Sequence, residues 1–143
     1  AVGVADGGVA ADLGVFDADG SFLSVDDLGL GPAVLMPDVG LTGRLAAVLA
    51  GVGVRSRRGT VLTVATVTGT ARRADELAGR WSPVAEAMEG HPVALAAARY
   101  SVPFAEVRAI SNAVGRRDRT AWDLPAALLG LETVGAALVV WSG

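Results

Sequence analysis

Apolar residues along the chain follow two spacings, one typical of helices and one typical of strands. Residues 41–49 place apolar side chains at positions i, i+4, i+7 and i+8, as an amphipathic helix does, and Gly51 and Gly53 should end this helix. Residues 60–68 are β-branched at most positions and apolar on both faces near their middle. This second pattern predicts a strand in a sheet that helices cover on both sides.

Three further helices are predicted from capping residues and small apolar side chains. Thr70 should cap a helix over residues 71–80, directly after a glycine turn. Residues 92–100 are nearly all Ala, Val and Leu, and such small side chains would let a helix pack close to the sheet. Asp123 should cap a last helix that runs toward Val140, with a proline tolerated in its first turn.

The remaining segments predict strands and turns. Residues 1–40 hold many Gly and Asp and are expected to form short strands and loops, whereas residues 54–58 should be a basic surface turn. Residues 103–110 predict a second strand. The order strand, helix, helix, strand, helix indicates one α/β domain over residues 1–143 with a mostly parallel mixed sheet.

The composition supports a folded domain and excludes several function classes. Hydrophobic residues make up 52% of the chain and the mean hydropathy is +0.48, which is ample material for a core. With 12 basic and 15 acidic side chains, the net charge of -3 provides no positive field for nucleic acid or an anionic bilayer. A small neutral ligand is therefore the expected partner.

The absence of cysteine and the single histidine narrow the chemistry. They leave no disulfide, no thiolate nucleophile and no cluster of nitrogen or sulfur ligands for a metal. We expect a mechanism without metal or cofactor, in the cytoplasm. No apolar run reaches the roughly 18 residues that a membrane-spanning helix needs, and no signal peptide pattern is present at the N-terminus, so no membrane partner is expected.

Glu89 is the first candidate for chemistry, because it lies just ahead of the alanine-rich helix. Free backbone N–H groups and the helix dipole favour an ionised carboxylate there. Such an anion could accept hydrogen bonds from the hydroxyl groups of a ribose and stabilise positive charge as a glycosidic bond breaks. Glu89 could equally serve only as part of a helix cap, and Met88 beside it could pack under a sugar or simply fill the core.

Polar residues at the two predicted strand ends are the second group of candidates. Ser111 and Asn112 directly follow an apolar strand, at the edge where open α/β sheets bind ligands, although Ser-Asn also favours a simple turn. Thr68 and Gly69 end the other strand and offer a hydroxyl and a flexible backbone to a heterocycle.

Other polar residues favour structural roles. His91 has no predicted Asp or Ser partner for a catalytic triad. Glu106 and Arg108 alternate along one strand face and could form a paired interior couple. The charged residues 115–119 predict a solvated loop, from which Asp118 could reach a ligand.

Four segments in this order resemble the futalosine hydrolases, a branch of the nucleoside phosphorylase and methylthioadenosine nucleosidase superfamily: residues 63–70 (TVATVTGT), 87–90 (AMEG), 102–112 (VPFAEVRAISN) and 117–122 (RDRTAW). The Met-Glu-Gly element is shared across the superfamily, whereas Ile-Ser-Asn followed by Arg-Asp-Arg and Trp points to the futalosine branch. The resemblance covers nearly the whole chain. It implies a three-layer α/β/α sandwich and a homo-oligomer.

The resemblance also implies an activity: hydrolysis of the N-glycosidic bond of futalosine, which releases hypoxanthine and dehypoxanthinyl futalosine in menaquinone biosynthesis. By this analogy Glu89 holds the ribose hydroxyls and Met88 packs under the sugar. Asn112 falls where adenine-specific nucleosidases carry an Asp. An amide can donate to a purine ring nitrogen or exocyclic oxygen and accept from a ring N–H, which suits a 6-oxopurine better than adenine.

The chain departs from the family pattern in two places. His91-Pro92 replaces the small or aromatic residues expected after Met-Glu-Gly. Family members also carry an upstream segment with a glycine-rich loop and the acidic residue thought to activate water, so we expect an N-terminally truncated chain that is inactive alone, with exposed apolar surface. A purine nucleoside phosphorylase, a methylthioadenosine/adenosylhomocysteine nucleosidase and an inactive purine-nucleoside-binding fragment are the alternatives.

Overall fold

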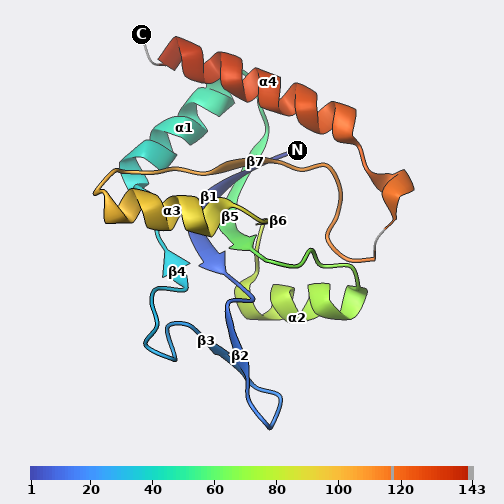
Figure 1. The fold of residues 1–143 in the computed structure, drawn as a ribbon. Helices are drawn as coiled ribbons and strands as arrows, with labels where there is room; N and C mark the ends of the chain where they lie inside the picture. Colours follow the sequence, from blue (N-terminus) through green and yellow to red (C-terminus); the bar gives the residue numbers. More distant parts are fainter. Residues whose placement is uncertain (117, 142–143) are drawn as a thin grey trace.

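The computed structural model describes residues 1–116 and 118–141, so Arg117 of the predicted charged loop lies outside the described residues (Figure 1). Its elements follow in the order β1 (Val2–Ala10), β2 (Gly14–Phe16), β3 (Phe22–Ser24), β4 (Val34–Leu35), α1 (Val39–Gly51), β5 (Ser56–Thr63), α2 (Ala71–Trp81), β6 (Ala85–Ala87), α3 (Gly90–Arg99), β7 (Val107–Ala109), a 3-10 helix (Arg119–Ala121) and α4 (Leu124–Trp141).

The main sheet is mixed and is built around β1. Strand β5 pairs parallel to β1 along its length, and β6 pairs parallel to β5. On its other side β1 pairs antiparallel with β7 near its start and with β4 near its end. The expected α/β class with a mixed sheet is confirmed, and β2 and β3 form a separate two-stranded sheet.

Helices pack on both faces of the sheet. Adjacent residues of a strand point to opposite faces. Leu62 packs in one cluster with Leu77 of α2, whereas the hydroxyl of the next residue, Thr63, accepts a hydrogen bond from the backbone N–H of His91 in α3. Helices α2 and α3 therefore lie on opposite sides of β5, which is the layering that the resemblance implies.

A register shift between Ala5 and Gly7 of β1 decides which side chains face each layer. Val4 is opposite Arg58 and Val9 is opposite Leu62, so the extra residue places Val4 and Val9 on the same face of the sheet. The start of β1 packs there against buried residues of α1 and α4, and the end of β1 packs against α2.

The predicted helices are confirmed, together with the two predicted capping residues. Thr70 Oγ1 accepts a hydrogen bond from Arg73 N at 3.3 Å, and Asp123 Oδ1 accepts from Ala126 N at 3.0 Å. At the start of α1, Asp38 Oδ1 accepts from Leu41 N at 2.7 Å, a cap that the sequence analysis did not identify. Short polar side chains thus satisfy backbone donors in the first turn.

The predicted strand bounds were less accurate. The strand expected over residues 60–68 is β5, which begins at Ser56 and ends at Thr63, so residues 56–58 are not a surface turn. Pairing with β1 draws the exposed arginines of this segment into the ladder in spite of their polarity. Likewise only Val107–Ala109 of the expected strand 103–110 pairs, because its partner is the short start of β1.

Many large apolar side chains are exposed, as expected for this chain. On α4 they are Leu124, Leu128, Leu129, Leu131 and Val139. In the part of the chain that the structure describes, no helix combines the length and apolar character needed to cross a membrane.

We predict that Leu49→Ala lowers the free energy of unfolding by about 2–5 kcal/mol, because Leu49 is fully buried between α1 and β1 and its removal leaves a cavity. Urea denaturation followed by circular dichroism measures this loss. Leu30→Ala is the matched control, since Leu30 is 76% exposed and should change stability by less than about 0.5 kcal/mol. Equal losses of unfolding free energy in both variants would show that Leu49 is not buried in the core as described.

Candidate functional site

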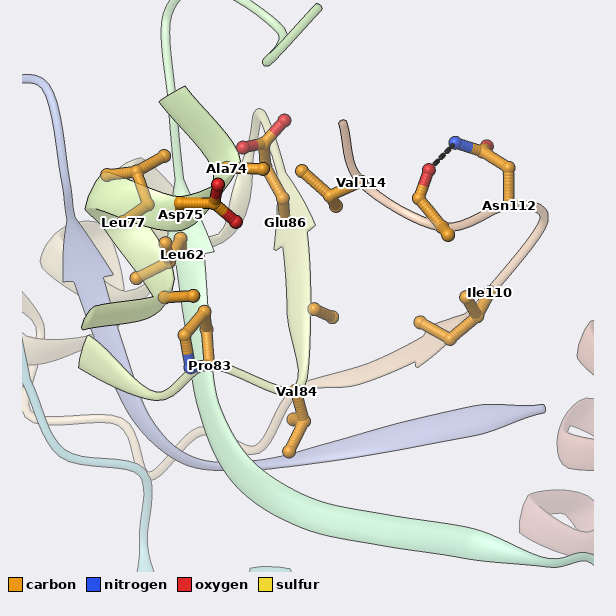
Figure 2. Close-up of a pocket in the computed structure, with 13 residues that line it drawn as sticks. Leu62, Ala74, Asp75, Leu77, Pro83, Val84, Glu86, Ile110, Asn112 and Val114 are labelled. Carbon is orange, nitrogen blue, oxygen red and sulfur yellow. Dashed lines mark hydrogen bonds between the residues drawn. The ribbon is translucent and has the colours of Figure 1, made fainter. Parts of the chain in front are cut away.

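The two loops that follow β5 and β7 enclose a cavity of about 440 Å³. The loop after β5 contributes residues 67–69 and the segment after β7 contributes residues between Asn112 and Trp122. A neighbouring cavity of about 380 Å³ lies between α2, β6 and the same segment, and Asn112 lines both (Figure 2). The candidate site therefore lies where the loop at the carboxyl end of β5 meets the segment after β7, and because β7 is antiparallel to β1, that segment starts beside the amino end of β1.

The amide of Asn112 is held by its chain neighbours. Ser111 Oγ donates to Asn112 Oδ1 at 2.7 Å. Asn112 Nδ2 donates to the carbonyl of Ala113 at 2.9 Å, the bond drawn as a dashed line in Figure 2. The carbonyl of Ser111 accepts from Asp123 N at 2.8 Å, which ties this turn to the start of α4. Each amide atom keeps capacity for one more hydrogen bond, the nitrogen as donor and the oxygen as acceptor.

Thr68 is fixed by Glu86, a residue that the sequence analysis did not single out. Thr68 is buried, and its N–H and hydroxyl both donate to the Glu86 carboxylate, at 2.9 Å and 2.5 Å. Glu86 belongs to β6 and lines the smaller cavity. The sequence offered one signal for Glu86, a carboxylate between two alanines. It was missed because β6 is only three residues long and was not recognised as a strand.

Asp12 organises the same loop from the end of β1. Its carboxylate accepts hydrogen bonds from Ala65 N at 2.8 Å and from Thr66 N at 3.3 Å. Val64 N still donates to the carbonyl of Ala87 in β6, but Ala65 and Thr66 lie beyond the sheet, and the Asp12 carboxylate accepts their hydrogen bonds instead. Asp12 and Glu86 together hold the loop that carries Thr68 and Gly69.

Glu89 and Met88 lie at the junction of β6 and α3 and do not line either cavity. Glu89 occupies the capping position of α3, but its side chain makes no capping hydrogen bond. Its carboxylate is 69% exposed and accepts from Met88 N at 3.3 Å and from Arg108 Nη1 at 3.2 Å. Met88 is 45% exposed, so it does not fill the core.

The six predicted site residues thus form two groups. Thr68, Gly69 and Asn112 share the 440 Å³ cavity, with Ser111 directly behind Asn112. Met88 and Glu89 form a second group between the end of β6 and the start of α3, two and three residues beyond Glu86. Arg108 links this second group to β7, the strand that leads to Asn112.

The predicted pair of Glu106 and Arg108 is confirmed. Arg108 Nε donates to Glu106 Oε1 at 2.7 Å, and Glu106 is 9% exposed. His91 is also structural, as expected: it is buried, and its Nε2 lies 2.8 Å from the carbonyl oxygen of Pro32.

Asp118 lines the 440 Å³ cavity from the loop before α4. The hydroxyl and the N–H of Thr120 donate to its Oδ1, at 2.6 Å and 3.0 Å. These hydrogen bonds lower the pKa of Asp118 below the ordinary value of 3.8, so it is ionised at neutral pH. Across residues 1–116 and 118–141, no group of three or more His, Asp or Glu side chains could hold a metal ion.

Comparisons with known proteins show which proteins this chain resembles. The chain is 53% identical over 134 residues to the futalosine hydrolase of Streptomyces coelicolor and 46% identical over 136 residues to that of Acidothermus cellulolyticus. These matches cover 92% and 94% of the chain but 54% and 55% of the relatives, so the chain spans about half the length of the curated relatives it matches.

Solved structures share the fold at low sequence identity. A 5'-methylthioadenosine/S-adenosylhomocysteine nucleosidase from Helicobacter pylori matches with a TM-score of 0.80 at 16% identity, covering 96% of this chain and 59% of that one. The native futalosine hydrolase of the same organism matches with a TM-score of 0.78 at 18% identity, with the same coverage. The profile of the phosphorylase superfamily matches residues 5–137, nearly the entire chain, and the protein therefore belongs to the phosphorylase superfamily.

Proposed function

We propose that this chain carries the purine- and ribose-binding groups of an enzyme that hydrolyses the N-glycosidic bond of futalosine, releasing hypoxanthine and dehypoxanthinyl futalosine. The observation that carries the proposal is the amide of Asn112, which lines a 440 Å³ cavity with Thr68 and Gly69 in a chain 46–53% identical to futalosine hydrolases. The reaction belongs to menaquinone biosynthesis in the cytoplasm.

Asn112 recognises the base in this proposal. The free hydrogen of Nδ2 donates to a ring nitrogen or to the exocyclic oxygen of hypoxanthine, and Oδ1 accepts from a ring N–H. The hydrogen bond from Ser111 supports this assignment because it holds Oδ1 and therefore determines which side of the amide donates. An amide stabilises the departing base by hydrogen bonding and transfers no proton to it.

Glu89 binds the sugar. Its exposed carboxylate accepts hydrogen bonds from the vicinal ribose hydroxyls and stabilises the positive charge that the ribose acquires as the bond to the base breaks. Glu86 and Asn112 both line the smaller cavity, and Glu89 follows Glu86 by three residues. In this proposal the nucleoside extends from Asn112, which binds the base, along the end of β6 to Glu89, which binds the ribose. Met88 then packs against the sugar.

The protein acts as a homo-oligomer in this proposal, because the large apolar side chains exposed on α4 need cover from another surface. A 6-oxopurine substrate is favoured over adenine, since an adenine nucleosidase uses an acid where this chain has Asn112.

We predict that residues 1–143 alone bind inosine but do not hydrolyse futalosine at an enzyme-like rate, because no side chain assigned here activates the attacking water. Calorimetry measures binding, and chromatography of released hypoxanthine measures turnover. A chimera in which residues 5–137 replace the matching part of the Streptomyces coelicolor enzyme should restore hydrolysis. Rapid release of hypoxanthine by the chain alone would refute the prediction, and failure of the chimera would refute the proposed function.

In the same chimera, Asn112→Ala should lower kcat/KM for futalosine by roughly 100-fold, because it removes the group that stabilises the departing base. Val102→Ala is the control, because Val102 is 55% exposed and lines neither cavity, and it should change kcat/KM by less than about threefold. Steady-state kinetics measure both effects. If Asn112→Ala left kcat/KM unchanged, the base would have to lie elsewhere.

For binding to the chain itself, Glu89→Gln should weaken inosine about tenfold, or about 1.4 kcal/mol, and leave hypoxanthine unaffected, since only inosine carries the ribose. Glu132→Gln on the exposed face of α4 is the matched control and should alter neither affinity. Competition calorimetry gives both constants. Equal loss for base and nucleoside would contradict a ribose-binding role for Glu89.

A further inference from the structure

The backbone around Glu106 is shaped to admit its carboxylate. Glu106 is only 9% exposed and sits against Gly90, the first residue of α3. A methyl group at position 90 would lie 2.5 Å from Glu106 Oε1 and 2.7 Å from Oε2, so no residue larger than glycine fits without moving the carboxylate.

Arg108 connects this buried carboxylate to the exposed one. Its Nε donates to Glu106 Oε1 at 2.7 Å and its Nη1 donates to Glu89 Oε2 at 3.2 Å. The guanidinium group is planar, so a hydrogen bond that holds Nε also sets the direction of Nη1. Glu106 therefore determines where Arg108 points, and Arg108 determines where the Glu89 carboxylate lies.

Stability alone does not explain a buried charge at position 106. Replacing a buried ion pair by apolar residues of similar volume is often neutral or stabilising, because two charges must otherwise lose their hydration. The ion pair between Asp6 and Arg58, at 2.6 Å, has side chains that are 44% and 47% exposed, so its two charges keep much of their hydration. We therefore expect the buried pair of Glu106 and Arg108 to have a role other than stabilising the core.

We propose that Glu106 is a positioning residue for the sugar site: through Arg108 it holds the Glu89 carboxylate in the orientation that accepts the ribose hydroxyls. This inference rests on the proposed function in that it takes the ligand to be a ribonucleoside. Glu106 does not touch the ligand. Its effect is transmitted by Arg108, and Gly90 is required because it leaves room for the carboxylate.

The test measures binding of inosine and hypoxanthine to the full 143-residue chain by calorimetry. Glu106→Met keeps the length of the side chain but removes both acceptor oxygens, and inosine should bind about tenfold more weakly while hypoxanthine is unaffected. Glu106→Gln retains one acceptor and should lose less. Gly90→Ala, which displaces the carboxylate without altering it, should reproduce the Glu106→Met result.

A double-mutant comparison separates positioning from a general structural effect. In an Arg108→Met background, Glu106→Met should cause no further loss of inosine affinity, because the group through which it acts is gone. Asp6→Asn, which breaks the exposed ion pair on β1, is the control and should leave both affinities unchanged. An additive loss, or wild-type inosine affinity in Glu106→Met, would overturn the inference.

A spectroscopic readout keeps the inference testable even if nucleosides do not bind. The Nε–H of Arg108 should give a protected NMR resonance in the wild-type chain, which disappears in Glu106→Met and persists in Asp6→Asn. Protection with no binding of inosine would reject the proposed function while supporting the link from Glu106 to Arg108. Lack of protection in the wild-type chain would reject the link itself.

Discussion

The parallel pairing of β1 with β5 is the interaction on which the remaining structure depends. The eight paired positions of this ladder bring the ends of two distant segments together, so that Asp12 beyond β1 reaches the backbone of Ala65 and Thr66 beyond β5. Parallel strands present their carboxyl ends at one edge of a sheet. The backbone pairing of β1 with β5 consequently determines where the loop that carries Thr68 starts, independently of the side chains of the site.

Side-chain carboxylates then replace the strand partners that the loops lack. Asp12 and Glu86 accept hydrogen bonds from the backbone of the loop after β5, and Glu106 holds Arg108 at the other side of the site. Asp12 and Glu86 thereby tie this loop to the end of β1 and to β6, and the donor to Glu106, Arg108, belongs to β7. A site arranged in this way meets its ligand with little reorganisation, which is the condition under which electrostatic stabilisation of a transition state is most effective.

Local signals in the sequence were sufficient for the helices and insufficient for the strand bounds. Asp38, Thr70 and Asp123 mark the helix starts because capping is a contact within four residues. The extent of β5 depends on β1, more than forty residues away, so the polarity of Ser56–Arg58 was misleading. The position of Asn112 in the cavity follows a local signal, the end of a strand, and could be predicted from the sequence. The hydrogen bonds that Thr68 donates to Glu86 could not be predicted without knowing that β6 pairs with β5.

The register shift in β1 has a consequence for how this protein can vary. Val4 and Val9 face the same layer only because one surplus residue separates them, and Gly8 lies on the opposite face near Glu106. Removing that residue would reverse the inward and outward orientation of everything on one side of it. Length changes of a single residue are thus incompatible with the central strand, while the hairpin from β2 to β3, which belongs to a separate small sheet, is free to lengthen or shorten during divergence.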